Sequence, residues 1–298
     1  MQGLLHWLLA SSLRSGAVAG ALAASRVFDI FGAGLLALVT LRKGFASALQ
    51  VMAVAAPLLL IAGYFSGFGM ALVIAILGLW IPVLLLSLVL RNTGSLAMTL
   101  QAGAGLAGVV LAGWFLLDAE PLGTVRAFLD SQVLPLLAQM DSKTALSDEQ
   151  HDALVRIAPG LMAAASLVVT MLAVMAGRWW QAIAFNPGGF REDFHRLRQG
   201  RSATLLVAVL MFAALFTGQP VLMGFALGGA VTLIFQGIAL AHGVVAATGQ
   251  PGIWLWGMYG LVLLLPIPAA ALLTIAGGVD NWMDFRRLAG QGAVKPNE

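Results

Sequence analysis

The sequence carries little charge for its length. Only 10% of its 298 residues are Asp, Glu, Lys or Arg, whereas ordinary globular domains hold about 25%. Hydrophobic residues make up 60% of the chain, before its 35 glycines are counted. This composition cannot supply the charged surface of a water-soluble enzyme, and it is equally unlike a disordered or collagen-like chain. The class that remains is a polytopic integral membrane protein.

Cysteine is absent, which excludes disulfide bonds, thiolate metal sites and cysteine nucleophiles. The formal net charge is +3, but the basic residues lie between apolar segments and form no single stripe. We therefore expect no nucleic-acid partner. Basic residues beside apolar segments normally set membrane topology and attract anionic lipid. Membrane lipids are the first partners that we expect.

Long stretches without charge predict the membrane spans. A spanning helix needs roughly 20 residues, and the stretch from Ser202 to Val279 runs for 78 residues without a charged side chain. The apolar runs are continuous and do not alternate with polar residues, so they indicate helices. We predict an all-α bundle, a single membrane domain over residues 1–298, with about eight spans at residues 15–41, 44–63, 68–90, 95–117, 157–177, 202–217, 221–241 and 253–277.

The first span has an alternative interpretation. Arg26 and Asp29 lie at its centre, where ionisable groups are costly and mark either a functional site or a break in the helix. Their spacing of three residues would let them pair with each other on one helix. The alternative divides 15–41 into two short helices, 15–25 and 30–41, that turn at residues 26–29.

The only long polar segment is residues 118–156, which holds seven of the thirteen acidic residues. Six apolar residues recur there at helical spacing and predict an extramembrane amphipathic helix on the membrane surface, bent at Pro135. Ser147 and Gln150 form a capping box that opens a second short helix toward Pro159. The six apolar residues are Leu122, Val125, Leu129, Val133, Leu136 and Met140.

The distribution of charge favours one orientation of an eight-span chain only slightly. The loops at 42–43, 91–94 and 178–201 share one face and hold eight Lys and Arg residues, against seven on the other face. The positive-inside rule separates eight from seven only slightly. The densest basic cluster is in 178–201, so we place that loop in the cytoplasm. In this orientation the C-terminus, which is also basic, lies outside the cytoplasm.

Motifs for catalysis and for cofactors are absent. The chain has no H-E-x-x-H, P-loop or G-x-S-x-G sequence, so we predict neither an enzyme nor a cofactor. Residues 103–108 match G-x-G-x-x-G, but no predicted strand precedes them, and we interpret these glycines as helix-packing positions. Asp148, His151 and Asp152 share a helix face that could ligate a metal. We interpret them as a solvated helix start and predict no metal site.

Two sets of polar residues are candidate binding sites. The first set lies within or at the edge of the apolar spans and would suit a small polar molecule, although turns and interhelical hydrogen bonds also explain it. Its members are Arg26, Asp29, Gln101, Gln236 and His242. The second set follows the 157–177 span and would suit a lipid phosphate or another anion, although a plain interfacial anchor explains it too. Its members are Arg178, Trp179, Trp180, Gly188, Gly189, Arg191 and Arg198.

Several segments carry a resemblance to a known family. They are Arg178-Trp179-Trp180-Gln181, Asn186-Pro187-Gly188-Gly189-Phe190-Arg191, Leu38-Val39-Thr40-Leu41-Arg42-Lys43-Gly44 and Ala241-His242-Gly243. Over most of its length the chain resembles the YybS-like family of bacterial multi-pass membrane proteins of unknown function. That family is distantly similar in fold to the substrate-binding components of energy-coupling-factor transporters. The resemblance implies a docking stripe of small residues on the first span, for which Ala17, Ala19, Ala21 and Ala23 would serve.

These observations give two functional hypotheses. The first is a protein of the bacterial cytoplasmic (inner) membrane that binds or transports a small molecule while partner membrane proteins supply energy. The second is a membrane scaffold or assembly factor that recruits proteins or anionic lipid through residues 118–156 and the basic segment after Gly189. A pocket with convergent polar groups would favour the first hypothesis, and solidly packed spans would favour the second.

Overall fold

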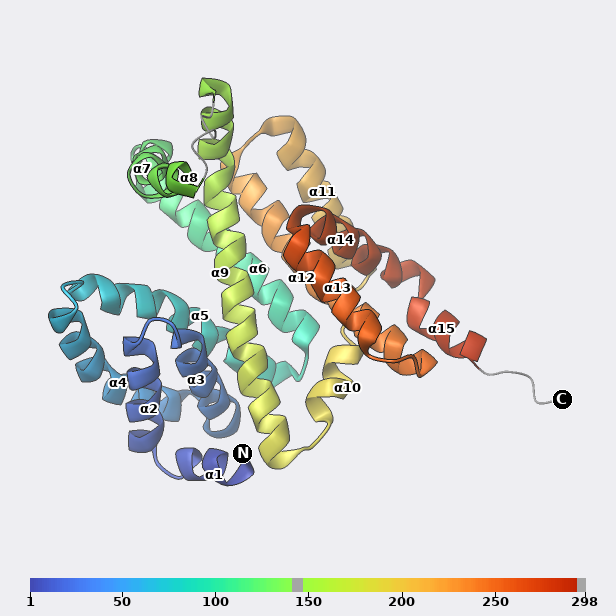
Figure 1. The fold of residues 1–298 in the computed structure, drawn as a ribbon, viewed down its shortest axis with the longest axis horizontal. Coiled ribbons are helices and arrows are strands. Elements are labelled where there is room, and N and C mark those ends of the chain that lie inside the picture. Colours follow the sequence, from blue (N-terminus) through green and yellow to red (C-terminus); the bar gives the residue numbers. More distant parts are fainter. Residues whose placement is uncertain (141–146, 294–298) are drawn as a thin grey trace.

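The computed structural model describes residues 1–140 and 147–293, and it assigns them to helices and the turns between them, without strands. The long helix α9 (Asp148–Phe185) runs through the middle of the molecule, with an N-terminal group of helices on one side and a C-terminal group on the other (Figure 1). The all-α fold that the sequence predicts is therefore confirmed for these residues.

The N-terminal group packs around one buried helix. Helix α3 is buried along the ten residues from Gly32 to Leu41, and it contacts helices α2, α4, α5 and α9. A continuous apolar run of this kind needs neighbours on every side. The helices of this group are α1 (Gln2–Leu9), α2 (Ser12–Ala24), α3 (Asp29–Lys43), α4 (Phe45–Phe65) and α5 (Met70–Thr93). Helix α6 (Leu96–Leu117) follows, crosses behind α9 in Figure 1 and contacts α5, α9 and α12.

The segment after α6 forms a small unit at the upper end of Figure 1. It comprises α7 (Pro121–Phe128), the π-helical turn η1 (Leu129–Val133) and α8 (Leu134–Met140). Val125 and Leu129 are buried against Val155 and Ala158 of α9, so the apolar face of the predicted amphipathic helix packs on α9. The capping box of Ser147 and Gln150 is confirmed, but its helix does not stop at Pro159 and continues as α9. Residues 141–146 lie outside the described chain.

The C-terminal group is built on the long helix α12. It comprises α10 (Gly189–His195), α11 (Arg201–Thr217), α12 (Pro220–Thr248), α13 (Ile253–Leu264), α14 (Pro266–Met283) and α15 (Phe285–Ala293). Helix α12 contacts α6, α9, α11, α14 and α15. Helices α13 and α14 run in opposite directions as a hairpin (Figure 1), and no residue of α13 is buried.

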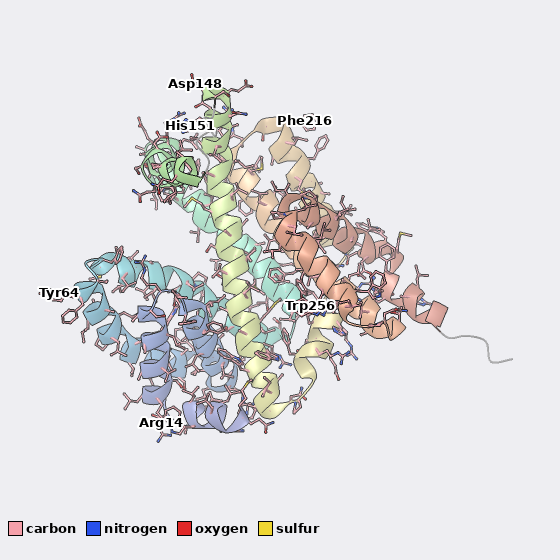
Figure 2. The ribbon with its side chains drawn as sticks, in the orientation of Figure 1. Arg14, Tyr64, Asp148, His151, Phe216 and Trp256 are labelled. Carbon is pink, nitrogen blue, oxygen red and sulfur yellow. The ribbon has the colours of Figure 1, made fainter. Side chains whose placement is uncertain are left out.

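Five helices are long and apolar enough to cross a membrane: α4, α5, α6, α9 and α12. A sixth span results if α1 and α2, which meet at a bend of 111°, are counted as one, and α11 is apolar but only 17 residues long. Large apolar side chains stay exposed on these and neighbouring helices, including Phe216 at 71% and Trp256 at 74% (Figure 2). Exposed apolar surface of this extent belongs in lipid, which supports a multi-pass membrane protein.

Two of the eight predicted spans are wrong as single helices. Residues 15–41 form α2 and α3, joined by a turn in which Arg26 has a φ of 62°, as in the alternative interpretation. Residues 253–277 fall in α13 and α14, which are separated at Leu265. Pro266 begins the second helix, since proline lacks the N–H that a continuing helix would need and suits a first helical position.

The two hairpins place both ends of the chain on one face. Each returns the chain to the side that it left, so α1 and α15 lie on the same side as α10. Three contacts tie helices together at this face: Gln2 of α1 donates to Ile183 O at 2.9 Å, Arg91 of α5 to Thr40 O at 2.9 Å, and Arg286 of α15 to Leu197 O at 3.0 Å. This basic face carries Arg14, Arg42, Lys43, Arg91, Arg178, Arg191, Arg196, Arg198, Arg201, Arg286 and Arg287.

The opposite face is acidic. Its described part, formed by α7, η1, α8 and the start of α9, has Arg126 and Arg156 as its basic residues. Asp148 and His151 lie at this end of the molecule, and Arg14 lies at the other (Figure 2). The acids of this face are Asp118, Glu120, Asp130, Asp148, Glu149 and Asp152. The near balance expected from the sequence therefore depended on treating residues 15–41 and 253–277 as single helices, which the structure does not show.

Close helix packing uses the small residues that the sequence indicates. A Cβ atom at Gly108 would lie 2.2 Å from the ring of Phe225, and one at Gly16 would lie 2.5 Å from the Val54 side chain. Gly103 faces Leu167 and Leu86 in the same way, at 2.7 and 2.9 Å. The interpretation of the G-x-G-x-x-G match as a packing surface is confirmed for Gly103 and Gly108, whereas a Cβ atom at Gly105 would meet nothing within 4 Å.

Candidate functional site

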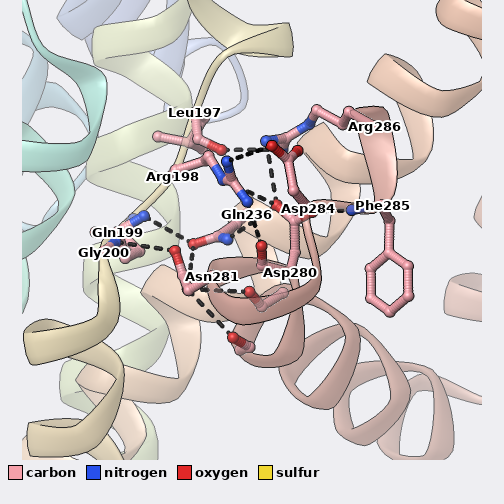
Figure 3. Close-up of polar contacts among 12 residues, drawn as sticks. Leu197, Arg198, Gln199, Gly200, Gln236, Asp280, Asn281, Asp284, Phe285 and Arg286 are labelled. Carbon is pink, nitrogen blue, oxygen red and sulfur yellow. Dashed lines mark hydrogen bonds and ion pairs between the residues drawn. The ribbon is translucent and has the colours of Figure 1, made fainter. Parts of the chain in front are cut away.

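A buried polar cluster holds the C-terminal group together near the basic face (Figure 3). Its centre is Asp280, near the end of α14, whose side chain has no exposed surface. Asp280 Oδ2 lies 3.1 Å from Arg286 Nη1 and 3.5 Å from Arg198 Nε, and it accepts a hydrogen bond from Gln236 Nε2 at 3.3 Å. The backbone N–H of Phe285 donates to Asp280 Oδ1 at 3.2 Å. The buried carboxylate is thus compensated by two guanidinium groups and two hydrogen bonds.

Amide side chains extend the cluster across three helices. Gln101 of α6 donates to Gln199 O at 2.9 Å and to Gln199 Oε1 at 3.0 Å. The backbone N–H of Gln199 donates to Gln236 Oε1 at 2.8 Å, and Asn281 Nδ2 donates to the same oxygen at 3.3 Å. Asn281 Oδ1 accepts from Gly200 N at 3.0 Å. Buried backbone groups need such partners.

The cluster therefore fixes the linker at residues 196–200, which leaves α10 and enters α11. The linker finds partners on four helices outside its own chain neighbours: α6, α12, α14 and α15. The body of α10 is tied to α9 by an ion pair between Arg178 Nη2 and Asp193 Oδ2, at 2.6 Å. The turn before α10 uses Gly188, whose φ of 89° suits a residue without a Cβ atom. Helix α10 is thus held by the linker that follows it and by its ion pair with α9.

A cavity of 460 Å³ lies under α10, between α9, α12 and α13. Aromatic side chains form part of its wall: Trp179 of α9, and Phe190 and Phe194 of α10, whose rings stack with centroids 5.9 Å apart. The apolar wall continues from Trp179 to Leu172 on α9, which is seven residues or about 10 Å along a helix. We call this space the inner cavity.

Polar groups gather at the end of the inner cavity nearest the basic face. Arg191, His195 and His242, here called the polar triad, line both the inner cavity and a second cavity of 410 Å³, the outer cavity. The rings of His195 and His242 have centroids 6.2 Å apart, and His242 Nε2 lies 2.8 Å from the Tyr259 hydroxyl of α13. The triad thus stands at the boundary between an apolar space and a more polar one.

The surroundings of the polar triad favour anions. Burial lowers the pKa of His195, and the charge of Arg191 and the neighbouring His242 and Arg286 lower it further. Arg286 reaches the back of the triad, because a Cβ atom at Gly243 would lie 3.0 Å from Arg286 Nε and 3.4 Å from His195 O. No carboxylate lines either cavity among the described residues.

The structure brings three predicted site residues into one cavity. Trp179 and Arg191 came from the anion-binding set and His242 from the substrate set, and all three line the inner cavity. Gln101 and Gln236 meet through Gln199 in the buried polar cluster instead.

The remaining anion-set residues support the site from outside it. Arg178 pairs with Asp193, and Arg198 pairs with Asp280. Trp180 stacks on Phe31, on the other side of α9, with ring centroids 6.4 Å apart. Gly188 and Gly189 form the turn into α10, where Asn186 packs so closely that a Cβ atom at Gly189 would lie 2.3 Å from its Nδ2 atom.

Arg26 and Asp29 do not line these cavities. Arg26 lies in the turn between α2 and α3, and Asp29 is the first residue of α3. Their predicted pairing is wrong. Asp29 accepts a hydrogen bond from Trp80 Nε1 at 3.0 Å, and the Arg26 guanidinium lies over the ring of Phe68, 4.0 Å from its centroid. The helix breaks between the two residues, so the spacing that would place them on one helix face does not apply.

Sequence reasoning missed His195, Tyr259 and the burial of Asp280. The sequence did offer a clue to His195, because helical spacing places it on the same basic face as Arg191. The sequence offered a clue to Asp280 as well, since it is the first charged residue after 78 uncharged ones.

Among the described residues no three His, Cys, Asp or Glu side chains are placed to hold a metal ion. Comparison with family models, curated proteins and solved structures gives no match for this chain.

Proposed function

We propose that this multi-pass membrane protein binds a small amphipathic anion in the inner cavity, with the anionic group at the polar triad. The observation that carries the proposal is the convergence of Arg191, His195, His242 and Tyr259 at one end of an aromatic-lined cavity. Ligand sites combine a mostly apolar wall with a few convergent polar groups in this way.

The direction of the cavity favours an amphiphile. Its polar end lies at the basic face, and its apolar walls on α9 and α12 extend toward the middle of two candidate spans. On α12 the wall runs from His242 back to Phe235, again about 10 Å. An anionic head at the triad would therefore have its apolar part inside the membrane's hydrocarbon layer.

The distribution of charge supports a cytoplasmic location for the basic face. Lys and Arg near the ends of spans are retained on the cytoplasmic side, and this face holds eleven of the sixteen basic residues. Both termini and the 178–201 segment would then be cytoplasmic. From the sequence resemblance we propose further that the protein belongs to the YybS-like family and lies in the bacterial inner membrane.

Transport would require partner proteins, because the sequence offers no nucleotide-binding motif for energy supply. The alternative, a scaffold or assembly factor, is favoured by one observation: α7, η1 and α8 form a separate small unit on the acidic face, with its own core against α9. That unit does not account for the polar triad on the opposite face, so we place ligand binding first.

Binding to the purified protein tests the proposal. In nanodiscs of phosphatidylcholine, dodecanoate and dodecyl phosphate should each raise the unfolding temperature saturably, whereas dodecanol, which has the same chain and no charge, should not. Arg191→Gln should weaken the binding of either anion by tenfold or more, because a hydrogen bond to a charged group is worth about 1.5–3 kcal/mol. Arg196→Gln is the matched control, since Arg196 is exposed one turn away and lines neither cavity. Equal effects of the two variants would contradict the proposal.

A further inference from the structure

We infer that the ligand's anionic group is a phosphate monoester and that the polar triad selects it over a carboxylate. This inference rests on the proposed function and names the chemical class that the same site takes. It starts from the number of donors. Arg191 and His195 reach the site from α10, His242 from α12, and Tyr259 from α13 beside His242.

The donors would occupy every lone-pair position of a carboxylate. A guanidinium binds a carboxylate through two parallel hydrogen bonds, one to each carboxylate oxygen. The imidazoles of His195 and His242 would have to crowd onto the two lone-pair positions that remain on the same two oxygens. A phosphate monoester offers three terminal oxygens and a charge of about −1.5 to −2 near pH 7. It can accept from Arg191 and from both imidazoles at once.

The charge around the triad agrees with a doubly charged ligand. The groups that face His195 are Arg191 on its own helix, His242 of α12 and Arg286 of α15. The acids of α10 do not offset them: Asp193 pairs with Arg178 of α9, and Glu192 lines neither cavity. Arg286 is shared with Asp280. Arg191 thus matches one negative charge of the ligand, and the second is matched when His195 takes up a proton.

Binding should also be linked to a proton. Burial and positive neighbours lower the pKa of His195 and keep its imidazole neutral near pH 7. A phosphate dianion beside it favours the imidazolium, so the complex would take up a proton that the free protein lacks. Affinity for the dianion should then rise as the pH falls from 8 to 7, in a range where the phosphate itself remains mostly doubly charged.

The outer cavity gives the headgroup room. It continues from the triad along α12 to the turn at Gly249, Gln250 and Gly252, on the basic face. A phosphate bound between the two cavities would have its ester chain in the inner cavity and its terminal oxygens toward the outer one. This arrangement suits a single-chain lipid phosphate drawn from the membrane, with the head exposed to the cytoplasmic side.

Direct competition tests the inference. Dodecyl phosphate should bind the protein in phosphatidylcholine nanodiscs about tenfold more tightly than dodecanoate, which corresponds to one additional hydrogen bond to a charged group. Equal affinities for the two anions would overturn the inference and leave the proposed function standing. Failure of both anions to bind would overturn the proposed function as well.

A series of variants distinguishes specific contacts with the polar triad from nonspecific electrostatic attraction. His195→Gln should lower the affinity for dodecyl phosphate about tenfold, change the affinity for dodecanoate by less than twofold, and abolish the pH dependence between 8 and 7. His6→Gln is the matched control, because His6 lies on α1 and stacks edge-on against Phe185, outside both cavities. A loss of affinity for both anions to the same extent in His195→Gln would contradict selection by the triad, since it would show only that His195 shapes the cavity.

Discussion

The guanidinium of Arg286 lies 3.1 Å from the carboxylate of Asp280, and the same guanidinium donates to Leu197 O at 3.0 Å. One side chain of α15 thus joins the end of α14 to the linker after α10. The contact ties the linker after the candidate site to α14 and α15. Arg198, from the linker itself, reaches Asp280 from the other side at 3.5 Å.

Asp280→Asn should destabilise the protein strongly. Two guanidinium groups would lose their buried partner charge, and breaking a buried ion pair by removing one partner costs about 3–5 kcal/mol. Asp284→Asn is the control, because Asp284 is 42% exposed and pairs with Arg198 at 3.4 Å, where an ion pair contributes about 0–1 kcal/mol. Thermal unfolding in detergent measures both variants. A similar unfolding temperature for the two would show that the buried charge is not central to the fold.

The helices themselves were largely predictable from the sequence. The predicted spans 95–117, 202–217 and 44–63 agree with α6, α11 and α4 to within about two residues, because apolar runs end at charged or turn-forming residues. The breaks at Arg26 and Leu265 were harder to place. A hydropathy pattern shows that a segment is apolar, but a short helix that turns back has the same composition as a long one that continues.

The candidate site was predictable only in pieces. Trp179, Arg191 and His242 were each notable for their residue type, yet 63 residues separate Trp179 from His242 in the sequence. Their meeting depends on how α9, α10 and α12 pack, which local patterns do not contain. The pairing of Asp280 with Arg198, 82 residues away, is of the same kind.

The absence of cysteine makes the topology directly testable. Arg196→Cys and Arg287→Cys should react with a membrane-impermeant maleimide only after the cells are opened, and Ser131→Cys should react on intact cells. All three residues are exposed, so accessibility depends on the side of the membrane. The eight-span arrangement predicts instead that positions 196 and 287 react on opposite sides. If positions 196 and 287 were both labelled on intact cells, they would still share one face of the membrane, but that face would be the outer one.

The junction between α6 and α7 should loosen in acid. Asp118 accepts hydrogen bonds from the backbone N–H of Glu120 and the Thr124 hydroxyl, both at 3.0 Å, and from Trp114 Nε1 at 3.2 Å. The first of these bonds has the largest effect in lowering the pKa of Asp118 below its ordinary value of 3.8. A lowered carboxyl pKa stabilises the fold above that ordinary value and loses its effect as the pH falls through the folded-state value.

Trp114 reports this transition. Its fluorescence should stay constant from pH 7 to about 4 and change below the ordinary Asp118 pKa of 3.8. Asp118→Ala should show the changed signal already at pH 7, and Trp114→Phe identifies the contribution of that indole among the eight tryptophans. Glu120→Gln is the control, because it keeps the backbone N–H that Asp118 accepts. A transition that Asp118→Ala leaves unaltered would assign the effect to another group.

Two adjacent glycines of α14 should respond oppositely to a methyl group. A Cβ atom at Gly277 would lie 2.2 Å from Leu233 O and 2.9 Å from Gly237 N, so alanine there would force α14 away from α12. Overpacking of this kind costs about 1–3 kcal/mol or more. At Gly278 the nearest atom, Thr204 Cγ2, would be 3.4 Å away. Alanine should fit there and stabilise the helix by roughly 0.5–1 kcal/mol through reduced backbone entropy of the unfolded chain.

The same pair of variants tests whether helix spacing controls the ligand site. Asn281 and Gln236 bridge α14 and α12 at 3.3 Å, and through Gln199 they hold the linker that ends α10. Gly277→Ala should therefore lower the unfolding temperature and also weaken the binding of dodecyl phosphate, whereas Gly278→Ala should preserve binding. If Gly277→Ala lowered stability but bound dodecyl phosphate with unchanged affinity, the polar cluster would hold the helices together without positioning α10.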